Sequence, residues 1–237
     1  MDARLRRIAL CIMAKAPAAG QVKTRLCPPL SLDEAARLYQ CFLEDKIAQV
    51  LGIHGVEPVL AYAPDDAAAI FEALAPGVTL VPQGGGDLTS RLVSVLERLF
   101  ESGFDAAIVI DSDTPTLPSG LLDHAVALLV SGEPDLVLGP SEDGGYYLIG
   151  LWRVHRPLFD GMPWSTPAVL EETIRRARRL GLRVARIAPW YDVDTGEDLA
   201  RLMSELEDDA RRPPIHTRRL LLSMGEPLSQ AGASKWP

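Results

Sequence analysis

The chain has 237 residues, of which 47% are hydrophobic and 24% charged, and its formal net charge is −8 at pH 7. These values are typical of a globular protein with one main domain and a full core. The negative charge argues against nucleic acid as the main partner, because phosphate contacts need a basic surface.

Three cysteines, Cys11, Cys27 and Cys41, have a spacing that fits neither a disulfide framework nor a zinc site. A basic start followed by the apolar residues 8–14 imitates a signal peptide, but Lys15 ends the apolar run too early. No stretch approaches the length of a spanning helix. We therefore expect a cytoplasmic protein without a membrane span.

Apolar runs of strand length alternate with segments of helical spacing along the chain. A first strand is expected at residues 8–13, and Ser31 with Glu34 forms a capping box that opens the first helix. Further strands are expected at 57–63, 78–82, 106–110, 135–139, 146–151 and 184–187. Further helices are expected at 65–74, from 87 or 89 to about 99, at 118–130, at 167–180 with Thr166 as its cap, and from Thr195 to about 207.

This βα alternation, which we expect throughout, predicts an α/β fold with a mostly parallel central sheet and helices on both faces. Residues 1–210 are expected to form this domain. From Arg211 onward prolines, glycines and small polar residues predominate, apart from the apolar residues 220–222. Residues 211–237 are therefore expected to be partly ordered at best.

Residues 106–110 are apolar throughout and predict a strand buried on both faces in the middle of the sheet. Asp111, Ser112 and Asp113 follow at its carboxyl end, where open α/β sheets bind ligands. A turn beginning at Ser112 would bring both carboxylates to one ion, and hard oxygen ligands favour Mg²⁺ or Mn²⁺. The alternative is a polar loop whose side chains bond to nearby backbone N–H groups.

A second acidic pair, Asp192 and Asp194, follows the last expected strand. Two acidic pairs on neighbouring strand ends can share one ion or two. The competing interpretation is that this pair helps to cap the helix that Thr195 opens.

The loop at residues 14–25 follows the first strand and combines small residues with three cations. Such a loop can approach a nucleotide closely and neutralise its diphosphate, although Val22 stands where a P-loop needs glycine. After the third strand, glycines and Asp87 could approach a ribose or base. The candidates for nucleotide binding are Lys15, Gly20, Lys23, Thr24, Arg25, Gly86 and Asp87. The alternatives are a flexible surface loop and a flexible connector.

The segment from Glu142 to Tyr147 sets acidic residues against two glycines and two tyrosines. Its backbone and aromatic faces can approach a sugar ring, and Asp143 is a candidate general base. The candidates for acceptor binding are Gly144, Gly145, Tyr146, Trp164 and Thr166. The alternative is a tight turn with core tyrosines, and a helix start that merely caps and packs.

Taken together, the ordered motifs resemble the small bacterial GT-A-fold glycosyltransferase family of the nucleotide-diphospho-sugar transferase superfamily, of the arsenosugar-biosynthesis type. The resemblance covers about residues 8–206. The motifs that carry it are Ala14-Lys15-Ala16-Pro17 with Lys23-Thr24-Arg25-Leu26, Gly86-Asp87-Leu88 with Arg91, Ser112-Asp113-Thr114-Pro115, Gly139-Pro140 with Glu142-Asp143-Gly144-Gly145-Tyr146-Tyr147-Leu148, Trp164-Ser165-Thr166, and Asp192-Val193-Asp194-Thr195 with Glu197-Asp198-Leu199.

The resemblance implies a Rossmann-like GT-A domain, a nucleoside diphosphate held by the first loop, and a divalent cation at the acidic strand end. The family commonly has glycine where this chain has Asp111, and Gly-Glu where it has Thr89-Ser90. The expected function is metal-dependent transfer of a sugar from a nucleotide sugar to a small acceptor. Asp111, Asp113 and Asp194 are the expected ligands of Mg²⁺ or Mn²⁺, and Asp113 and Asp143 the expected catalytic residues.

The Lys-Thr-Arg-Leu and Asp-Val-Asp-Thr motifs also resemble guanylyl- and other nucleotidyltransferases of the same superfamily. The alternative function is therefore the joining of a nucleoside triphosphate to a phosphorylated small molecule with release of pyrophosphate. A non-catalytic nucleotide-binding module is a third hypothesis.

Overall fold

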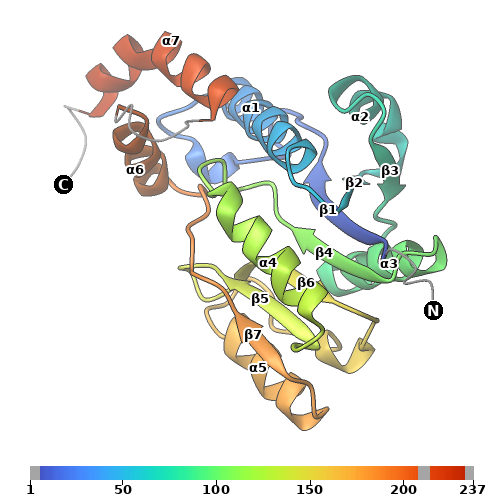
Figure 1. Cartoon of the computed structure of the whole chain (residues 1–237). Coiled ribbons are helices and arrows are strands. Elements are labelled where there is room, and N and C mark those ends of the chain that lie inside the picture. The colour runs from blue at the N-terminus through green and yellow to red at the C-terminus, as the bar shows by residue number, and fades with distance from the viewer. Residues whose placement is uncertain (1–5, 208–213, 233–237) are drawn as a thin grey trace.

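The computed structural model describes residues 6–207 and 214–232. Its centre is a seven-stranded sheet with the order β3-β2-β1-β4-β6-β5-β7 (Figure 1). The strands are β1 (Ile8–Lys15), β2 (Glu57–Ala63), β3 (Thr79–Pro82), β4 (Ala106–Ile110), β5 (Leu136–Pro140), β6 (Tyr146–Leu151) and β7 (Val184–Arg186). Each predicted strand is present, with its ends within two residues of the expected ones.

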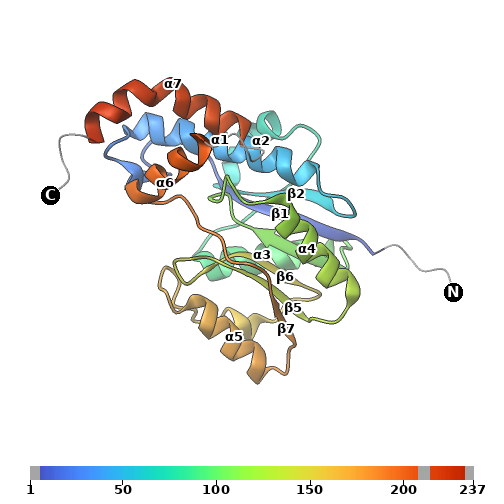
Figure 2. The same ribbon diagram turned by 60° about the vertical axis from the view of Figure 1, so that its left-hand side comes forward.

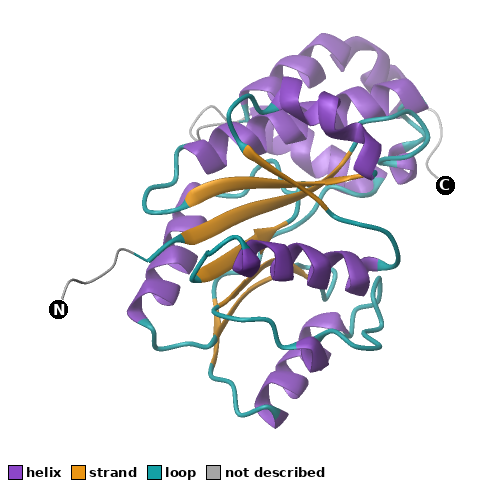
Figure 3. Ribbon diagram, turned by 90° about the vertical axis from the view of Figure 1, so that its right-hand side faces the viewer, coloured by secondary structure: helices purple, strands orange, loops and turns teal. Residues whose placement is uncertain are grey.

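Helices cover both faces of the sheet (Figures 2 and 3). They are α1 (Leu32–Leu51), α2 (Ala68–Leu74), α3 (Leu88–Glu101), α4 (Ser119–Ser131), α5 (Val169–Arg179), α6 (Gly196–Glu207) and α7 (Ile215–Gly232). Core residues of α1, α4, α6 and α7 pack with Leu10 and Ile12 of β1, whereas those of α3 and α5 pack with Ala9 and Cys11. The predicted α/β fold, a Rossmann-like sheet between two helical layers, is confirmed.

Strand β4 is the middle strand, and all five of its residues are buried. It pairs parallel with β1 but antiparallel with β6, which also runs antiparallel to β5. The expected βα alternation is therefore wrong at this one step. The physical reason is the short connection between β5 and β6, since a parallel crossover needs a dozen or more residues and usually a helix.

The first helix begins as predicted. Ser31 Oγ accepts a hydrogen bond from the Glu34 N–H at 3.2 Å, and Glu34 Oε2 accepts one from the Ser31 N–H at 2.7 Å. The predicted start of α5 is wrong by two residues, because Ala168 rather than Thr166 is the residue that precedes the helix. Thr166 lies in the turn before it and donates to the Pro163 carbonyl oxygen at 2.7 Å.

Helix α7 was not predicted, since the composition of residues 211–237 argued for partial order at best. It lies along α1 (Figure 2). Both oxygens of Asp45 in α1 accept from its first turn, from the His216 N–H at 2.9 Å and the Thr217 N–H at 2.8 Å, and Leu221 is buried against the core. An aspartate from a distant segment thus caps this helix. Residues 211–213 and 233–237 lie outside the described residues.

Among the helices of residues 6–207 and 214–232, none is long and apolar enough to cross a membrane.

Candidate functional site

A cleft of about 600 Å³ opens at the carboxyl ends of β1 and β4. This is the point where the strand order changes direction, and open α/β sheets bind ligands there. The cleft is lined by Met13, Lys15, Gln21, Val22, Lys23, Thr24, Arg25, Tyr39, Leu88, Arg91, Leu92, Val109, Ile110, Asp111, Ser112, Asp113, Tyr146, Tyr147, Ile149, Trp164, Ser165 and Asp194.

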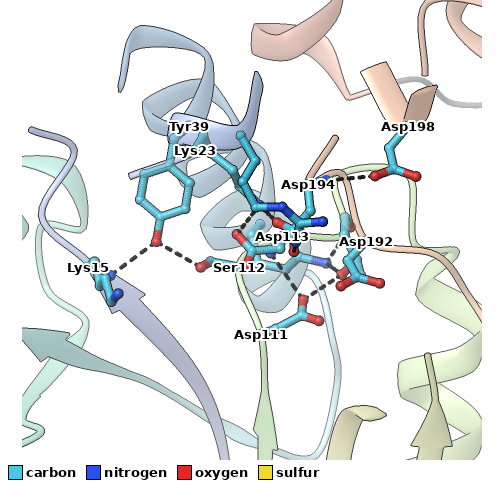
Figure 4. Close-up of polar contacts among 12 residues, drawn as sticks. Lys15, Lys23, Tyr39, Asp111, Ser112, Asp113, Asp192, Asp194 and Asp198 are labelled. Carbon is cyan, nitrogen blue, oxygen red and sulfur yellow. Dashed lines mark hydrogen bonds and ion pairs between the residues drawn. The ribbon is translucent and has the colours of Figure 1, made fainter. Parts of the chain in front are cut away.

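The two acidic segments of the sequence meet in this cleft (Figure 4). The Val193 N–H donates to the Asp113 carbonyl oxygen at 2.9 Å, which holds the segment before α6 against the segment after β4. Lys23 Nζ then lies 2.7 Å from Asp113 Oδ1 and 2.8 Å from Asp194 Oδ1. Arg25 approaches more loosely, with 3.9 Å between its Nη1 and Asp194 Oδ2. The predicted basic loop and the predicted acids therefore form one site.

Lys23 is predicted to bind a nucleotide, but its ammonium group lies between the carboxylates of Asp113 and Asp194. Its side chain is 4% exposed, and its backbone is left-handed with φ 49°. Burial acts to lower the pKa of the Lys23 ammonium, but the charges of Asp113 and Asp194 outweigh it and raise this pKa. The charge of Lys23 is therefore engaged by the two carboxylates.

Asp111 also lines the cleft, but it accepts hydrogen bonds from within its own turn. Its Oδ1 accepts from the Asp113 N–H at 3.1 Å and from Thr114 Oγ1 at 2.9 Å, which is the local polar turn that the sequence left as the alternative. Burial, followed by the nearby charge of Asp113, raises the pKa of the Asp111 carboxyl. Asp111 shapes the turn that presents Asp113 to the cleft.

Two side chains of α1 support this turn, and the sequence analysis missed both. Lys46 is fully buried and donates to the Thr114 carbonyl oxygen at 2.8 Å and to Thr114 Oγ1 at 2.9 Å. The Tyr39 hydroxyl bonds to Ser112 Oγ at 2.8 Å and accepts from the Lys15 N–H at 3.0 Å (Figure 4). A lysine on the apolar face of an amphipathic helix was the signal for Lys46.

The cleft offers a divalent cation two carboxylate ligands but, among the described residues, no larger group of protein ligands. Within residues 6–207 and 214–232 there is no group of three or more histidine, cysteine, aspartate or glutamate side chains placed to hold a metal. Asp113 and Asp194 nevertheless offer two hard carboxylates that are 36% and 39% exposed and share one cation, the ammonium of Lys23. Mg²⁺ needs no more than one or two carboxylates when waters and phosphates complete its shell. The assignment of Asp111 to the metal stays a prediction.

Asp192 lies beside this pair but is engaged elsewhere. Its Oδ1 accepts a hydrogen bond from Ser141 Oγ, and burial raises the pKa of its carboxyl. The alternative interpretation is that Asp192 and Asp194 help to cap the last predicted helix. A different side chain binds the N–H groups there: Asp198 Oδ2 accepts from the Thr195 N–H at 2.7 Å and from the Asp194 N–H at 3.1 Å.

The nucleotide-binding candidates divide into two groups. Lys15, Lys23, Thr24 and Arg25 line the cleft, whereas Gly20, Gly86 and Asp87 are not among the residues that line it. Asp87 is the N-cap of α3, where its Oδ1 accepts from the Ser90 N–H at 2.8 Å. A capping role thus accounts for Asp87 without a ribose.

The acceptor-binding candidates divide in the same way. Tyr146 and Trp164 line the cleft with their rings edge to face and 6.1 Å between centroids, and Trp164 Nε1 donates to Thr89 Oγ1 at 2.7 Å. Gly144, Gly145 and Thr166 do not line it. Asp143 does not line it either, and its Oδ1 accepts from the Gly145 N–H at 2.8 Å. A catalytic role for Asp143 stays a prediction.

Gly144 is needed for packing. Its φ is +92°, and a Cβ at this position would lie 2.3 Å from the Pro167 carbonyl oxygen. We expect Gly144→Ala to lower the free energy of unfolding by about 2–4 kcal/mol, through backbone strain and a clash with backbone that cannot swing away. Urea unfolding measures this. Gly161→Ala is the matched control, because Gly161 also has a positive φ but no neighbour within 4 Å; it should cost about 1 kcal/mol. Equal losses in the two variants would contradict the packing role.

Comparison with known proteins places this site in context. A family model described as "Uncharacterized protein conserved in bacteria (DUF2064)" matches residues 46–166. A crystal structure from Desulfovibrio desulfuricans G20, provisionally assigned as a nucleotide-diphospho-sugar transferase, is 32% identical with a TM-score of 0.86, and the match covers 94% of this chain and 97% of that one. The phosphoenolpyruvate guanylyltransferase of Mycobacterium leprae is 25% identical over an alignment of 200 residues, and the match covers 81% of this chain and 87% of the relative.

Glucosyl-3-phosphoglycerate synthase from Mycobacterium tuberculosis, solved with Mn²⁺ and uridine diphosphate, has a TM-score of 0.52 at 16% identity, and the match covers 85% of this chain and 77% of that one. At this identity the likeness is one of fold. The fold is the Rossmann-like fold of nucleotide-sugar and nucleotidyl transferases.

Proposed function

Because the chain belongs to the DUF2064 family of bacterial proteins and has the fold of nucleotide-diphospho-sugar transferases, we propose that it is a metal-dependent glycosyltransferase. It would move a sugar from a nucleotide-diphosphate sugar to a small acceptor. The observation that carries the proposal is the pair of carboxylates, Asp113 and Asp194, that share one cation position in a cleft beside a basic loop.

The proposed roles follow from the positions of the side chains. Asp113 and Asp194 would hold Mg²⁺ or Mn²⁺, which when bound stabilises negative charge on the leaving nucleoside diphosphate. Lys15 and Arg25, whose side chains reach the cleft, would bind phosphate oxygens, Arg25 with a bidentate fork. Tyr146 and Trp164 form an aromatic wall on which a sugar or acceptor can pack.

The second candidate function is nucleotidyl transfer, in which a nucleoside triphosphate is joined to a phosphorylated small molecule. It is favoured by the 25% identity to a phosphoenolpyruvate guanylyltransferase over most of both chains. Both reactions use a metal on a nucleotide pyrophosphate, so the carboxylate pair serves either.

Product analysis separates the two functions. The protein is incubated with Mn²⁺, a panel of nucleotide sugars and nucleoside triphosphates, and candidate acceptors. Glycosyl transfer releases a nucleoside diphosphate, whereas nucleotidyl transfer consumes a triphosphate and releases pyrophosphate. Binding of a nucleotide without turnover of any donor would instead support a non-catalytic nucleotide-binding module and contradict both.

A further inference from the structure

Arg91, at the start of α3, has a role that the carboxylate pair does not explain. It lines the cleft, and its Nε is buried without a hydrogen-bond partner among the described residues. Within the part of the chain that the structure describes, no carboxylate lies within ion-pair distance of its guanidinium. A buried donor of a charged group is costly to leave unpaired, which points to a partner that arrives with a ligand.

Gln83 fixes the position of this guanidinium. Its side chain is fully buried at the ends of two strands, where Nε2 donates to the Ala14 carbonyl oxygen at 2.9 Å and to the Ala61 carbonyl oxygen at 2.8 Å. Its remaining polar atom, Oε1, accepts from Arg91 Nη1 at 3.2 Å. Because Nη1 is held in this way, Nε and Nη2, which share the other edge of the planar group, are left for a bidentate acceptor.

Lys15 belongs to the same part of the cleft. Side chains alternate along β1, so Lys15 leaves the strand on the side of Cys11 and Met13, which pack in the core cluster of α3. Its side chain also has no carboxylate within ion-pair distance among the described residues. Lys23, in contrast, is neutralised by Asp113 and Asp194. On this side of the cleft Lys15 and Arg91 therefore have no ion pair among the described residues, and the acidic charge that acts on Arg91 there is that of Asp87, one turn earlier.

We propose that Arg91, oriented by Gln83 and assisted by Lys15, binds a phosphate group of the substrate. The inference rests on the proposed transferase function and deepens it, because it adds a phosphate subsite on the α3 side of the cleft. The phosphate belongs either to the nucleotide or to a phosphorylated acceptor. An arginine edge matches the geometry of phosphate oxygens, and the carboxylates next to Lys23 leave no comparable anion site there.

The test compares Arg91→Met with Arg98→Met. Arg98 lies two turns further along α3, is exposed, and donates to Ser94 Oγ within the same helix. Arg98→Met therefore removes the same charge from the same helix as Arg91→Met does, but at a position outside the cleft. Calorimetry with Mn²⁺ measures the affinity for the nucleoside mono-, di- and triphosphates of each common base, and for phosphoenolpyruvate in the presence of the nucleoside diphosphate that binds. We expect Arg91→Met to weaken binding of the phosphate-bearing probe about 10- to 100-fold, the usual effect of losing a charged hydrogen bond.

The arms of the experiment identify the source of the phosphate. A loss that grows from mono- to triphosphate assigns the subsite to the nucleotide, and a loss confined to phosphoenolpyruvate assigns it to the acceptor. Arg91→Lys, which keeps the charge but not the fork, should recover part of the affinity, and unchanged melting without ligand shows that the variants fold. If Arg91→Met binds every probe as the wild type does, the inference is wrong while the proposed function stands. If the wild type binds no nucleotide, both are wrong.

Discussion

Replacing Asp113 with asparagine should lower kcat at least about 100-fold and abolish the metal-dependent rise in melting temperature that a nucleotide ligand produces. Asp113 contributes one of the two carboxylates that share a cation position in the cleft. Metal-ion stabilisation of developing charge is worth several kcal/mol, and each 1.36 kcal/mol corresponds to a factor of ten in rate. Asparagine keeps the shape but removes the charge that holds the cation.

The measurement is a melting series with and without Mn²⁺ and nucleotide, together with the rate of product release. Asp123→Asn is the control, because Asp123 is exposed on α4 and does not line the cleft. A wild-type metal response in Asp113→Asn would contradict the assignment.

Asp143→Asn adds a separate test: loss of turnover with nucleotide binding intact would support the predicted role of Asp143 as a general base.

Replacing Lys23 with methionine should destabilise the metal-free protein and make it more responsive to metal. The Lys23 ammonium lies between two carboxylates that would otherwise repel each other. We expect a loss of about 2 kcal/mol in the free energy of unfolding, below the roughly 3–5 kcal/mol for a fully buried pair, because solvent screens both half-exposed acids. Mn²⁺ should recover most of this loss, since a divalent cation can take the place of the ammonium between them.

Urea unfolding with and without Mn²⁺ measures both effects. Lys15→Met is the control for stability, since Lys15 is exposed and has no ion pair among the described residues. A Lys23→Met protein that is as stable as the wild type, or that gains no more from Mn²⁺ than the wild type does, would show that the ammonium does not occupy the cation position.

The sequence was most informative where local physics decides the outcome. The apolar run at β4 and the capping box at Ser31 follow from burial and local hydrogen bonding, and both were predicted. The five-residue connection before β6 already excluded a parallel crossover, so the antiparallel strand was predictable in principle. Helix α7 was not, because Asp45, which caps it, lies far away in the sequence.

The sequence predicted several of the residues that line the cleft, but not the contacts between their side chains. The sequence indicated that Lys23, Asp113 and Asp194 belong to one cleft, but not that the lysine would pair with both acids. Whether a carboxylate such as Asp111 faces a ligand or its own turn depends on side-chain rotamers that spacing does not encode. Arg91 and Gln83 were missed as a pair because their contact depends on how the ends of β1, β2 and β3 and the start of α3 lie together.

The reversed strand β6 has a consequence for how this cleft can diversify. The tight turn between β5 and β6 lies at the same edge of the sheet as the ends of β1 and β4, and Tyr146 follows it directly into the cleft wall. Exchanges in this hairpin therefore reach the cleft wall through Tyr146 and leave the ends of β1 and β4 in place. A swap of residues 141–145 must keep Gly144, where a Cβ would lie 2.3 Å from the Pro167 carbonyl oxygen, and it acts on the cleft through Tyr146, since none of these five residues lines it.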